Sequence, residues 1–595
     1  MIALVAMEIF HARCFRCLAI PGFVRALHKD YRTATPQNFS SYESMKKDFK
    51  LEIPEYFNFA EDVLDQWTKM EKVGKRPSNP AFWWINGNGE EVRWSFEELG
   101  SLSRKFANIL TEACSLKRGD PVIVILPKIP EWWLANVACL RTGTVLIPGT
   151  TQLTQKDILY RLQSSKAKCI ITNDVLAPAV DAVASKCENL HSKLIVSQNS
   201  REGWVNLKEM MKCASDTHSC VKTKHNEMMG IFFTSGTTGL PKMIGHTHSF
   251  GLGLSVNGRY WLDLTPLDVM WNTSDTGWAK TAWSSVFSPW IQGSCVFVHY
   301  LPHFEPTSVL QTLSKFPITV FCSAPTGYRM LVQNDMESFL LNLTCFLRTW
   351  KFKSLKHCVS AGEPINPEVI EQWRNSTSLD IYEGYGQTET VLICGNFKGM
   401  KIKPGSMGKP SPAFNVKILD ENGNVLPPGQ EGDIGIQVLP NRPLGFFTHY
   451  VDNPSKTTST LRGSFYITGD RAYMDEDGYF WFVARSDDII LSSGYRIGPF
   501  EVESALNEHP SVAESAVVRS PDPIRGEVVK AFIVLNPDYK SHEQEQLKKE
   551  IQEHVKKTTA PYKYPRKVEF IEELPKTVSG KIKRNELRKK EWKTT

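Results

Sequence analysis

The sequence predicts an α/β protein with a large N-terminal domain of layered α/β sheets, a β-rich subdomain and a small α+β C-terminal domain. Three observations predict it. Short apolar runs alternate with amphipathic stretches from residue 46 to about 400, which is typical of βαβ units and mostly parallel sheets. After about residue 400, glycine and proline turns alternate with short strand patterns. After Asp487, apolar residues repeat every second position in some segments, as in strands, and every 3.6 positions in others, as in helices. We expect an extension at 1–45 and domains at 46–486 and 487–595.

The parallel sheets are predicted from short runs of β-branched and aromatic residues bounded by turn residues. Strands are expected at residues 122–126, 169–172, 194–197, 231–234, 318–322 and 357–360. Amphipathic patterns predict helices at 96–110 and 132–140, between the first strands.

The β-rich subdomain and the C-terminal domain are predicted in the same way. Alternating patterns indicate strands at 433–439 and 478–483, and then at 513–519, 528–535 and 568–571. Residues 543–557 place Leu547, Ile551 and Val555 on one face of a helix.

Composition excludes several classes of protein. The 595 residues are 41% hydrophobic, which excludes a disordered chain. A net charge of +6 from 70 basic and 64 acidic residues does not indicate a nucleic-acid partner. No apolar run reaches 18 residues, so no transmembrane helix is expected. The 13 cysteines lack metal-ligand spacing and indicate reduced thiols inside the cell.

The first 29 residues resemble a mitochondrial presequence. Glu8 is their one acidic residue, while bases are interleaved with apolar residues, and Pro21-Gly22 would interrupt a long helix. A secretory signal is the rival, but the apolar run at 2–7 is short and no basic segment precedes it. An N-terminus without an address is the third interpretation. We expect the mitochondrial matrix.

A phosphate-binding loop is predicted after the strand at 231–234. Glycines at 236 and 239 permit the backbone conformation that turns N–H groups inward, and such a nest binds phosphate oxygens. The P-loop motif of NTPases does not fit, because Met243 follows the lysine. The candidate ATP-binding residues are Thr234, Ser235, Gly236, Thr237, Thr238, Gly239, Leu240, Pro241 and Lys242.

This TSGTTGLPK segment resembles the signature of the adenylate-forming enzymes, which include acyl-CoA synthetases, luciferases and peptide-synthetase adenylation domains. YEGYGQTE at 382–389 resembles a second motif of that family. The flat Tyr385 ring suits adenine, and Glu389 is a hard oxygen ligand suited to Mg²⁺. The resemblance implies nucleotide contacts at Glu383, Gly384, Tyr385, Gly386, Gln387 and Thr388, with Thr388 also near the acyl substrate.

Three further motifs follow in the family's order. TGD places Asp470 where a carboxylate can accept both ribose hydroxyls, and the resemblance adds Arg485 to the ribose site. It implies that Asp487 is a hinge, that the C-terminal domain is mobile, and that Arg496 lies near the substrate. PKTVSGK at 575–581 implies that Lys581 is the catalytic lysine and also contacts ATP.

The tryptophan-rich segment 271–293 resembles the medium-chain acyl-CoA synthetases of mitochondria. In that branch Trp278 would lie near the acyl group, while Trp283 and Trp290 are expected in the aromatic core. The resemblance also implies CoA contacts at Gln152, Ser493, Gly494, Tyr495, Arg525, Lys556, Tyr564, Pro565 and Arg566.

The implied activity is ATP-dependent ligation of a small carboxylic acid, a medium-chain fatty acid or an aromatic acid such as benzoate, to CoA. Mg²⁺ is the expected metal, with Mn²⁺ as the alternative. Two alternatives stay open: another adenylate-forming reaction, or nucleotide binding with impaired turnover. The second arises because the segment around 339–350 is about eleven residues longer than the branch pattern. Chain-length preference and oligomeric state are not predicted.

Overall fold

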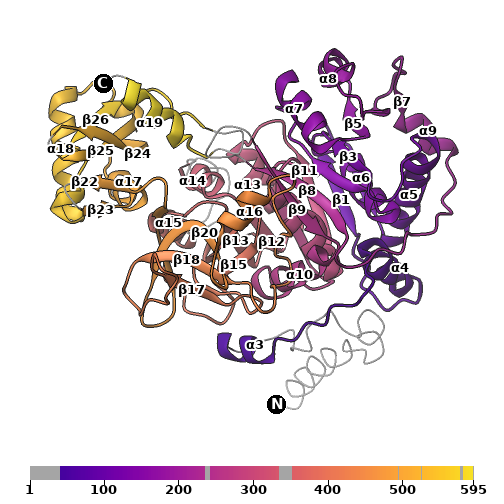
Figure 1. The fold of residues 1–595 in the computed structure, drawn as a ribbon, viewed down its shortest axis with the longest axis horizontal. Coiled ribbons are helices and arrows are strands. Elements are labelled where there is room, and N and C mark those ends of the chain that lie inside the picture. The colour runs from indigo at the N-terminus through magenta and orange to yellow at the C-terminus, as the bar shows by residue number, and fades with distance from the viewer. Residues whose placement is uncertain are drawn as a thin grey trace, which may run out of the picture.

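The computed structural model describes residues 41–234, 241–333, 352–492, 495–523, 525–576 and 581–593. The expected presequence and the segment at 339–350 lie outside these residues. A large body built on three sheets leads into a C-terminal unit, which stands at one end of the molecule (Figure 1).

A seven-stranded sheet has the order β7-β6-β5-β3-β4-β8-β9 and is parallel except for the β8–β9 hairpin. Its strands are β3 (Pro121–Val124), β4 (Val145–Pro148), β5 (Cys169–Asn173), β6 (Ser192–Val196), β7 (Val205–Asn206), β8 (Met228–Thr234) and β9 (Lys242–Thr247). The strands expected at 122–126, 169–172, 194–197 and 231–234 are confirmed within a few residues. Thr234 pairs with Lys242, so the hairpin brackets the predicted phosphate loop.

A nine-stranded sheet has the order β16-β15-β14-β13-β12-β10-β11-β1-β2, and the run from β14 to β1 is parallel. Its strands are β1 (Phe82–Asn86), β2 (Glu91–Trp94), β10 (Val269–Asn272), β11 (Cys295–Tyr300), β12 (Val320–Ser323), β13 (His357–Ala361), β14 (Ile381–Gln387), β15 (Val391–Gly395) and β16 (Lys409–Pro410). In open parallel sheets, ligands bind beyond the carboxyl ends of the strands.

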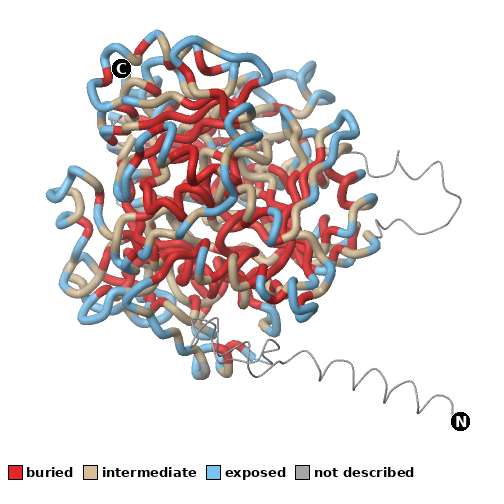
Figure 2. The backbone as a smooth tube through the Cα atoms, turned by 90° about the vertical axis from the view of Figure 1, so that its right-hand side faces the viewer, coloured by how far each residue is buried: buried red, intermediate tan, exposed pale blue. Residues whose placement is uncertain are grey.

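The core of the large body is packed against α6 (Pro130–Thr142), every residue of which from 132 to 142 is buried. A helix that is apolar on all sides requires such burial, and Figure 2 shows buried backbone through the centre of the molecule. α5 (Phe96–Asn108) begins with a capping box formed by Ser95 and Glu98 and continues as a π-helix at Ile109–Ala113. Trp290 is buried as expected, but Trp283 is only half-buried.

The remaining helices surround these sheets. They are α3 (Tyr42–Asp48), α4 (Asp65–Lys72), α7 (Gln155–Ser165), α8 (Ala177–Ala184), α9 (Leu207–Cys213), α10 (Ser249–Val256), α11 (Ala279–Ala282), α12 (Ser288–Ile291), α13 (Pro306–Lys315), α14 (Pro325–Gln333), α15 (Pro367–Thr377) and α16 (Pro454–Ser459). Short π-helices span Ala60–Leu64, Asn257–Trp261 and Trp283–Phe287.

The β-rich subdomain is an antiparallel sheet of β17 (Val416–Leu419), β18 (Gly432–Gln437), β19 (Leu461–Arg462), β20 (Phe465–Met474) and β21 (Phe480–Arg485). The C-terminal unit contains β22 (Ile490–Ser492), β23 (Tyr495–Ile497), β24 (Val512–Asp522), β25 (Gly526–Leu535), β26 (Lys567–Phe570), α17 (Pro499–Asn507), α18 (Gln544–Thr558) and α19 (Arg584–Lys593). Leu547, Ile551 and Val555 are buried in its own core, as predicted.

The structure bears on two expectations from the sequence, the absence of a transmembrane helix and the reduced state of the cysteines. Over the described part of the chain, no helix has the length and apolarity needed to cross a membrane. The ten cysteines in that part are all free thiols, and eight of them are buried.

Arg141 on α6 is 1% exposed, and both its terminal nitrogens donate to Asp65 at 2.9 and 2.7 Å. We expect Asp65→Ala to lower the free energy of unfolding by about 3 kcal/mol, because it leaves a buried cation without its carboxylate. Thermal unfolding measures the change. Glu97→Ala breaks an exposed pair with Lys72 and should change stability by less than about 0.5 kcal/mol. Equal effects of the two variants would contradict this prediction.

Candidate active site

Asp470 joins the nine-stranded sheet to the β-rich subdomain. Its carboxylate, 3% exposed, accepts hydrogen bonds from the Tyr385 hydroxyl at 2.5 Å and from Gln387 Nε2 at 2.6 Å. Arg485 lies 3.1 Å away on the neighbouring strand, since Asp470 and Arg485 are paired between β20 and β21. Burial raises the pKa of Asp470, and Arg485 and the two hydrogen bonds counteract this. Three sequence motifs therefore meet at one carboxylate.

The backbone of the 382–389 motif requires glycine. A Cβ on Gly386 would lie 1.9 Å from the Val391 carbonyl oxygen, and one on Gly384 would lie 2.6 Å from Leu392 and Trp261. The β14–β15 register also shifts between Tyr385 and Gly386. This close packing turns Tyr385 and Gln387 toward Asp470.

Glu389 lies at the end of the same motif. Its Oε1 accepts the Tyr450 hydroxyl at 2.8 Å, and burial raises the pKa of Glu389 while that bond and the charges of Arg485 and Lys242 lower it. The Thr388 carbonyl receives a 2.7 Å hydrogen bond from Nε2 of buried His246. Tyr450 and His246 were not predicted from the sequence. For His246, the one signal in the sequence is its place four residues after Lys242, which puts both side chains on the same face of β9.

Lys242 faces this group from β9, with its Nζ 5.9 Å from the centre of the Tyr450 ring. Burial lowers the pKa of Lys242, and the charge of Lys456 adds to this while Glu389 opposes it. Thr234 and Pro241 flank the rest of the predicted phosphate loop, and the Pro241 carbonyl accepts the Tyr160 hydroxyl at 2.9 Å. Residues 235–240 lie outside the described part.

Lys581 reaches this site from the C-terminal unit. Lys581 keeps an exposed surface, but desolvation of its ammonium lowers its pKa; Glu363 and Asp470 raise that pKa, and Lys280 and Arg485 lower it further. Lys280 itself donates to the Ala361 carbonyl at 2.6 Å, and Glu363 accepts the Thr326 hydroxyl at 2.7 Å. The structure thus brings Lys581 together with Asp470 and Arg485, which lie 111 and 96 residues earlier in the sequence.

The expected hinge lies beside the same cluster. Arg485 Nε is 3.6 Å from the Asp487 carboxylate, and Asp470 and Asp487 raise the pKa of Arg485 against the effect of its burial. Arg588 of α19 donates to the Asp487 carbonyl at 2.6 Å and to the Asp488 carboxylate at 2.5 Å. Arg496 lies in β23, opposite Leu491.

The residues expected to bind CoA are only partly gathered. Arg566 donates to the Tyr564 hydroxyl at 2.8 Å, Lys556 lies 4.5 Å over the same ring, and exposed Tyr495 stacks on Tyr562 at 4.3 Å. The Pro565 carbonyl accepts from Gln552 at 2.9 Å. Arg525 is exposed and its backbone N–H donates to Asp522, while exposed Gln152 lies in the seven-stranded sheet region, with no described contact to the C-terminal group. Ser493 and Gly494 lie outside the described residues.

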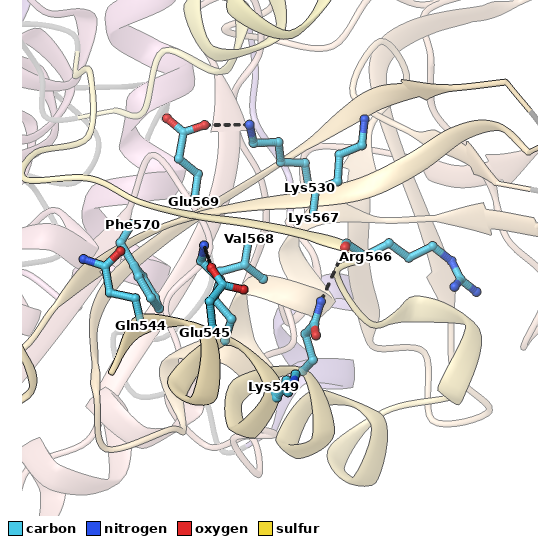
Figure 3. A pocket seen from close by; sticks show the side chains of 11 residues that line it. Lys530, Gln544, Glu545, Lys549, Arg566, Lys567, Val568, Glu569 and Phe570 are labelled. Atoms are coloured by element: carbon cyan, nitrogen blue, oxygen red, sulfur yellow. Dashed lines mark hydrogen bonds and ion pairs between the residues drawn. The ribbon is translucent and has the colours of Figure 1, made fainter. Parts of the chain in front are cut away.

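Two hollows border the candidate residues, one beside Arg566 and one beside Tyr450. One, of about 530 Å³, lies between α18 and β26 and includes Arg566 and Lys567 beside the Lys530–Glu569 ion pair (Figure 3). The other, of about 410 Å³, is lined by Tyr450 and the start of α16. On the expected acyl side, half-buried Trp278 precedes α11, and its Nε1 is buried with no described hydrogen-bond partner.

The chain matches two protein-family models. The AMP-binding enzyme model matches residues 70–437, and the AMP-binding enzyme C-terminal domain model matches residues 501–581. The human protein named acyl-coenzyme A synthetase ACSM3, mitochondrial, is 86% identical over 98% of both chains. The Pongo abelii protein of that name is 85% identical over all of both chains, and human ACSM4 is 60% identical over 96% of this chain and 97% of its own.

Solved structures agree with these matches. The anthranilate CoA ligase AuaEII in complex with anthranoyl-AMP has a TM-score of 0.80 and 27% identity, covering 91% of this chain and 98% of its own. A Brucella canis acyl-CoA synthetase has a TM-score of 0.70 and 31% identity over 93% and 100%. The relatives named mitochondrial confirm the expected mitochondrial location. The chain therefore belongs to the AMP-binding enzyme family and, within it, to the mitochondrial acyl-coenzyme A synthetases.

Proposed function

We propose that the protein activates a medium-chain fatty acid, or an aromatic acid such as benzoate, and transfers the acyl group to CoA. The observation that carries the proposal is that Lys581 lies within the charged cluster of Asp470, Arg485 and Glu363. That arrangement suits a step in which an anionic acid meets an anionic triphosphate. The solved relatives named benzoate CoA ligase and anthranilate CoA ligase support the aromatic option.

In the first half-reaction the substrate carboxylate attacks the α-phosphorus of ATP, giving acyl-AMP and pyrophosphate. Lys242 and Lys581 would neutralise the negative charge that the two anions bring together. Asp470 would accept the ribose hydroxyls, with Arg485 beside it, and the Tyr385 ring would pack on adenine. The residues of the 234–242 loop, Arg496 and Trp278 would bind the phosphates, the reacting carboxylate and the acyl group, respectively.

Mg²⁺ fits this site at Glu389. The hydrogen bond from Tyr450 is accepted by Oε1, so Oε2 can serve as an oxygen ligand, and burial disfavours the bare carboxylate charge that a cation would compensate. When bound, the ion would supply charge neutralisation at the phosphates. Mn²⁺ takes the same ligand type.

In the second half-reaction the CoA thiol attacks the acyl carbonyl carbon, the bond to AMP breaks, and acyl-CoA and AMP form. We infer that rotation of a mobile C-terminal domain (487–595) about Asp487 withdraws Lys581 and brings the C-terminal CoA residues to the acyl-AMP. Gln152 has no contact with Tyr495, Lys556 or Arg566 among the interactions of the described residues, which supports this proposal.

The test is pyrophosphate release with ATP and Mg²⁺ across butyrate, hexanoate, octanoate, palmitate and benzoate, each with and without CoA. CoA-dependent turnover with one acid class establishes the ligase and its substrate. Release without thioester formation favours another adenylate-forming reaction. ATP binding without release for any acid favours the alternative of impaired turnover.

Lys581→Ala should lower the rate of acyl-adenylate formation by more than about 100-fold, because the ammonium is lost from the developing charge. It should largely spare thioester formation from supplied acyl-adenylate. Single-turnover assays of the two half-reactions measure this. Lys583→Ala, two residues further along the chain, is the control and should leave both rates near wild type. Equal loss of both half-reactions in Lys581→Ala would refute the assignment of Lys581 as the catalytic lysine of adenylate formation.

The pH profile should also report Lys581. Desolvation holds the pKa of its ammonium below the usual 10.5, so the charged form is lost as pH rises through this lowered value. We expect kcat/KM for ATP to fall on the alkaline side at a lower pH than an ordinary lysine would give. Lys583→Arg should keep this alkaline fall. A wild-type profile that stays flat up to pH 10 would refute the prediction.

A further inference from the structure

A carboxylate on the C-terminal unit lies between two cations from different parts of the molecule. Glu514 of β24 is bound by Lys576 Nζ at 2.9 Å from Oε1 and 2.7 Å from Oε2. On its other side, Arg329 Nη1 lies 3.8 Å from Oε1. Arg329 belongs to α14, which lies on the side of the large body that faces the C-terminal unit (Figure 1). We propose that Glu514 is a positioning residue that docks the Lys581 hairpin, defined here as the paired residues 575–576 and 581–583, on the large domain for adenylation.

The contact with Lys576 fixes the start of the hairpin that carries Lys581. Lys576 is bridged to Ile582, and the Lys583 N–H donates to the Pro575 carbonyl at 2.8 Å, so both ends of the hairpin are joined. Lys576 lies five residues before Lys581. A salt bridge from Glu514 to Lys576 therefore ties the base of the hairpin to β24.

The contact with Arg329 places that hairpin relative to the reaction site. Three residues earlier on α14, the Thr326 hydroxyl donates to Glu363 at 2.7 Å, and the charge of Glu363 raises the pKa of the Lys581 ammonium. One helix thus holds Glu363 through its first turn and meets the C-terminal unit through Arg329. Docking of Glu514 on Arg329 sets the distance between Lys581 and Glu363.

The two contacts differ in what rotation about Asp487 does to them. Glu514 and Lys576 are both C-terminal to the hinge, so their bond moves as a unit. Arg329 is on the other side, so its contact with Glu514 exists only while Lys581 faces the large domain. An interaction present in one of two conformations shifts their equilibrium toward that conformation. The side chains of Arg329, Glu514 and Lys576 are 22%, 24% and 29% exposed, so solvent screens the cluster only partly.

The inference rests on the proposed two-step reaction, and its test separates the steps. Arg329→Gln and Glu514→Gln should each lower single-turnover adenylate formation by about three- to tenfold, which is the range of one partly buried ion pair. Thioester formation from supplied acyl-adenylate should stay unchanged or rise. The double variant should lose no more than Glu514→Gln alone, and Glu514→Asp should recover part of the rate. Arg374→Gln on α15, which breaks an ion pair with Asp380, should change neither step.

Thermal unfolding shows whether each variant is folded. Equal losses in both half-reactions would assign Glu514 a merely structural role, and unchanged adenylation in Arg329→Gln would remove the docking contact. Either result overturns the inference while wild-type pyrophosphate release still supports the proposed function. Absence of release in wild type would instead defeat the proposed function, and the inference with it.

Discussion

The buried carboxylate of Asp470 is the constraint on which the site depends. An ionised carboxylate that leaves water is stable only when donors and cations surround it. Tyr385 and Gln387 come from β14 of one sheet, and Arg485 comes from β21 of another. The two sheets must therefore meet in one register for this carboxylate to be satisfied. Removal of any partner would disturb the junction of the sheets as well as the site.

The same interaction links the site to the hinge. Arg485 lies two residues before Asp487 and within 3.6 Å of its carboxylate, so one guanidinium responds to both acids. On the far side, Arg588 holds the Asp487 carbonyl and the Asp488 carboxylate within the C-terminal unit. The peptide after Asp487 is thereby fixed to that unit. The rotation that we propose would then be confined to the backbone angles of Asp487 and the residues just before it.

Local patterns predicted the elements well, because buried parallel strands are short apolar runs and α18 repeats its apolar residues every four positions. The resemblance to a family, carried by motifs, predicted Asp470, Arg485 and Lys581 as one site. Neither source indicated Tyr450, Glu363 or Glu514, whose roles depend on contacts between distant segments. Trp283 packs against the core as expected but is only partly buried, because a tryptophan-rich run does not show how deeply each ring is buried.

Burial prepares the site for anions. Desolvation lowers the pKa of Lys242, which is half-buried, and of Lys581, which keeps an exposed surface. The charge of an arriving triphosphate would stabilise the charged form of both ammonium groups. Without the nearby carboxylates, the positive charges of Lys280 and Arg485 would repel the ammonium of Lys581 from the site. Asp470 and Glu363 raise the pKa of Lys581 and so hold it in place before substrate binds.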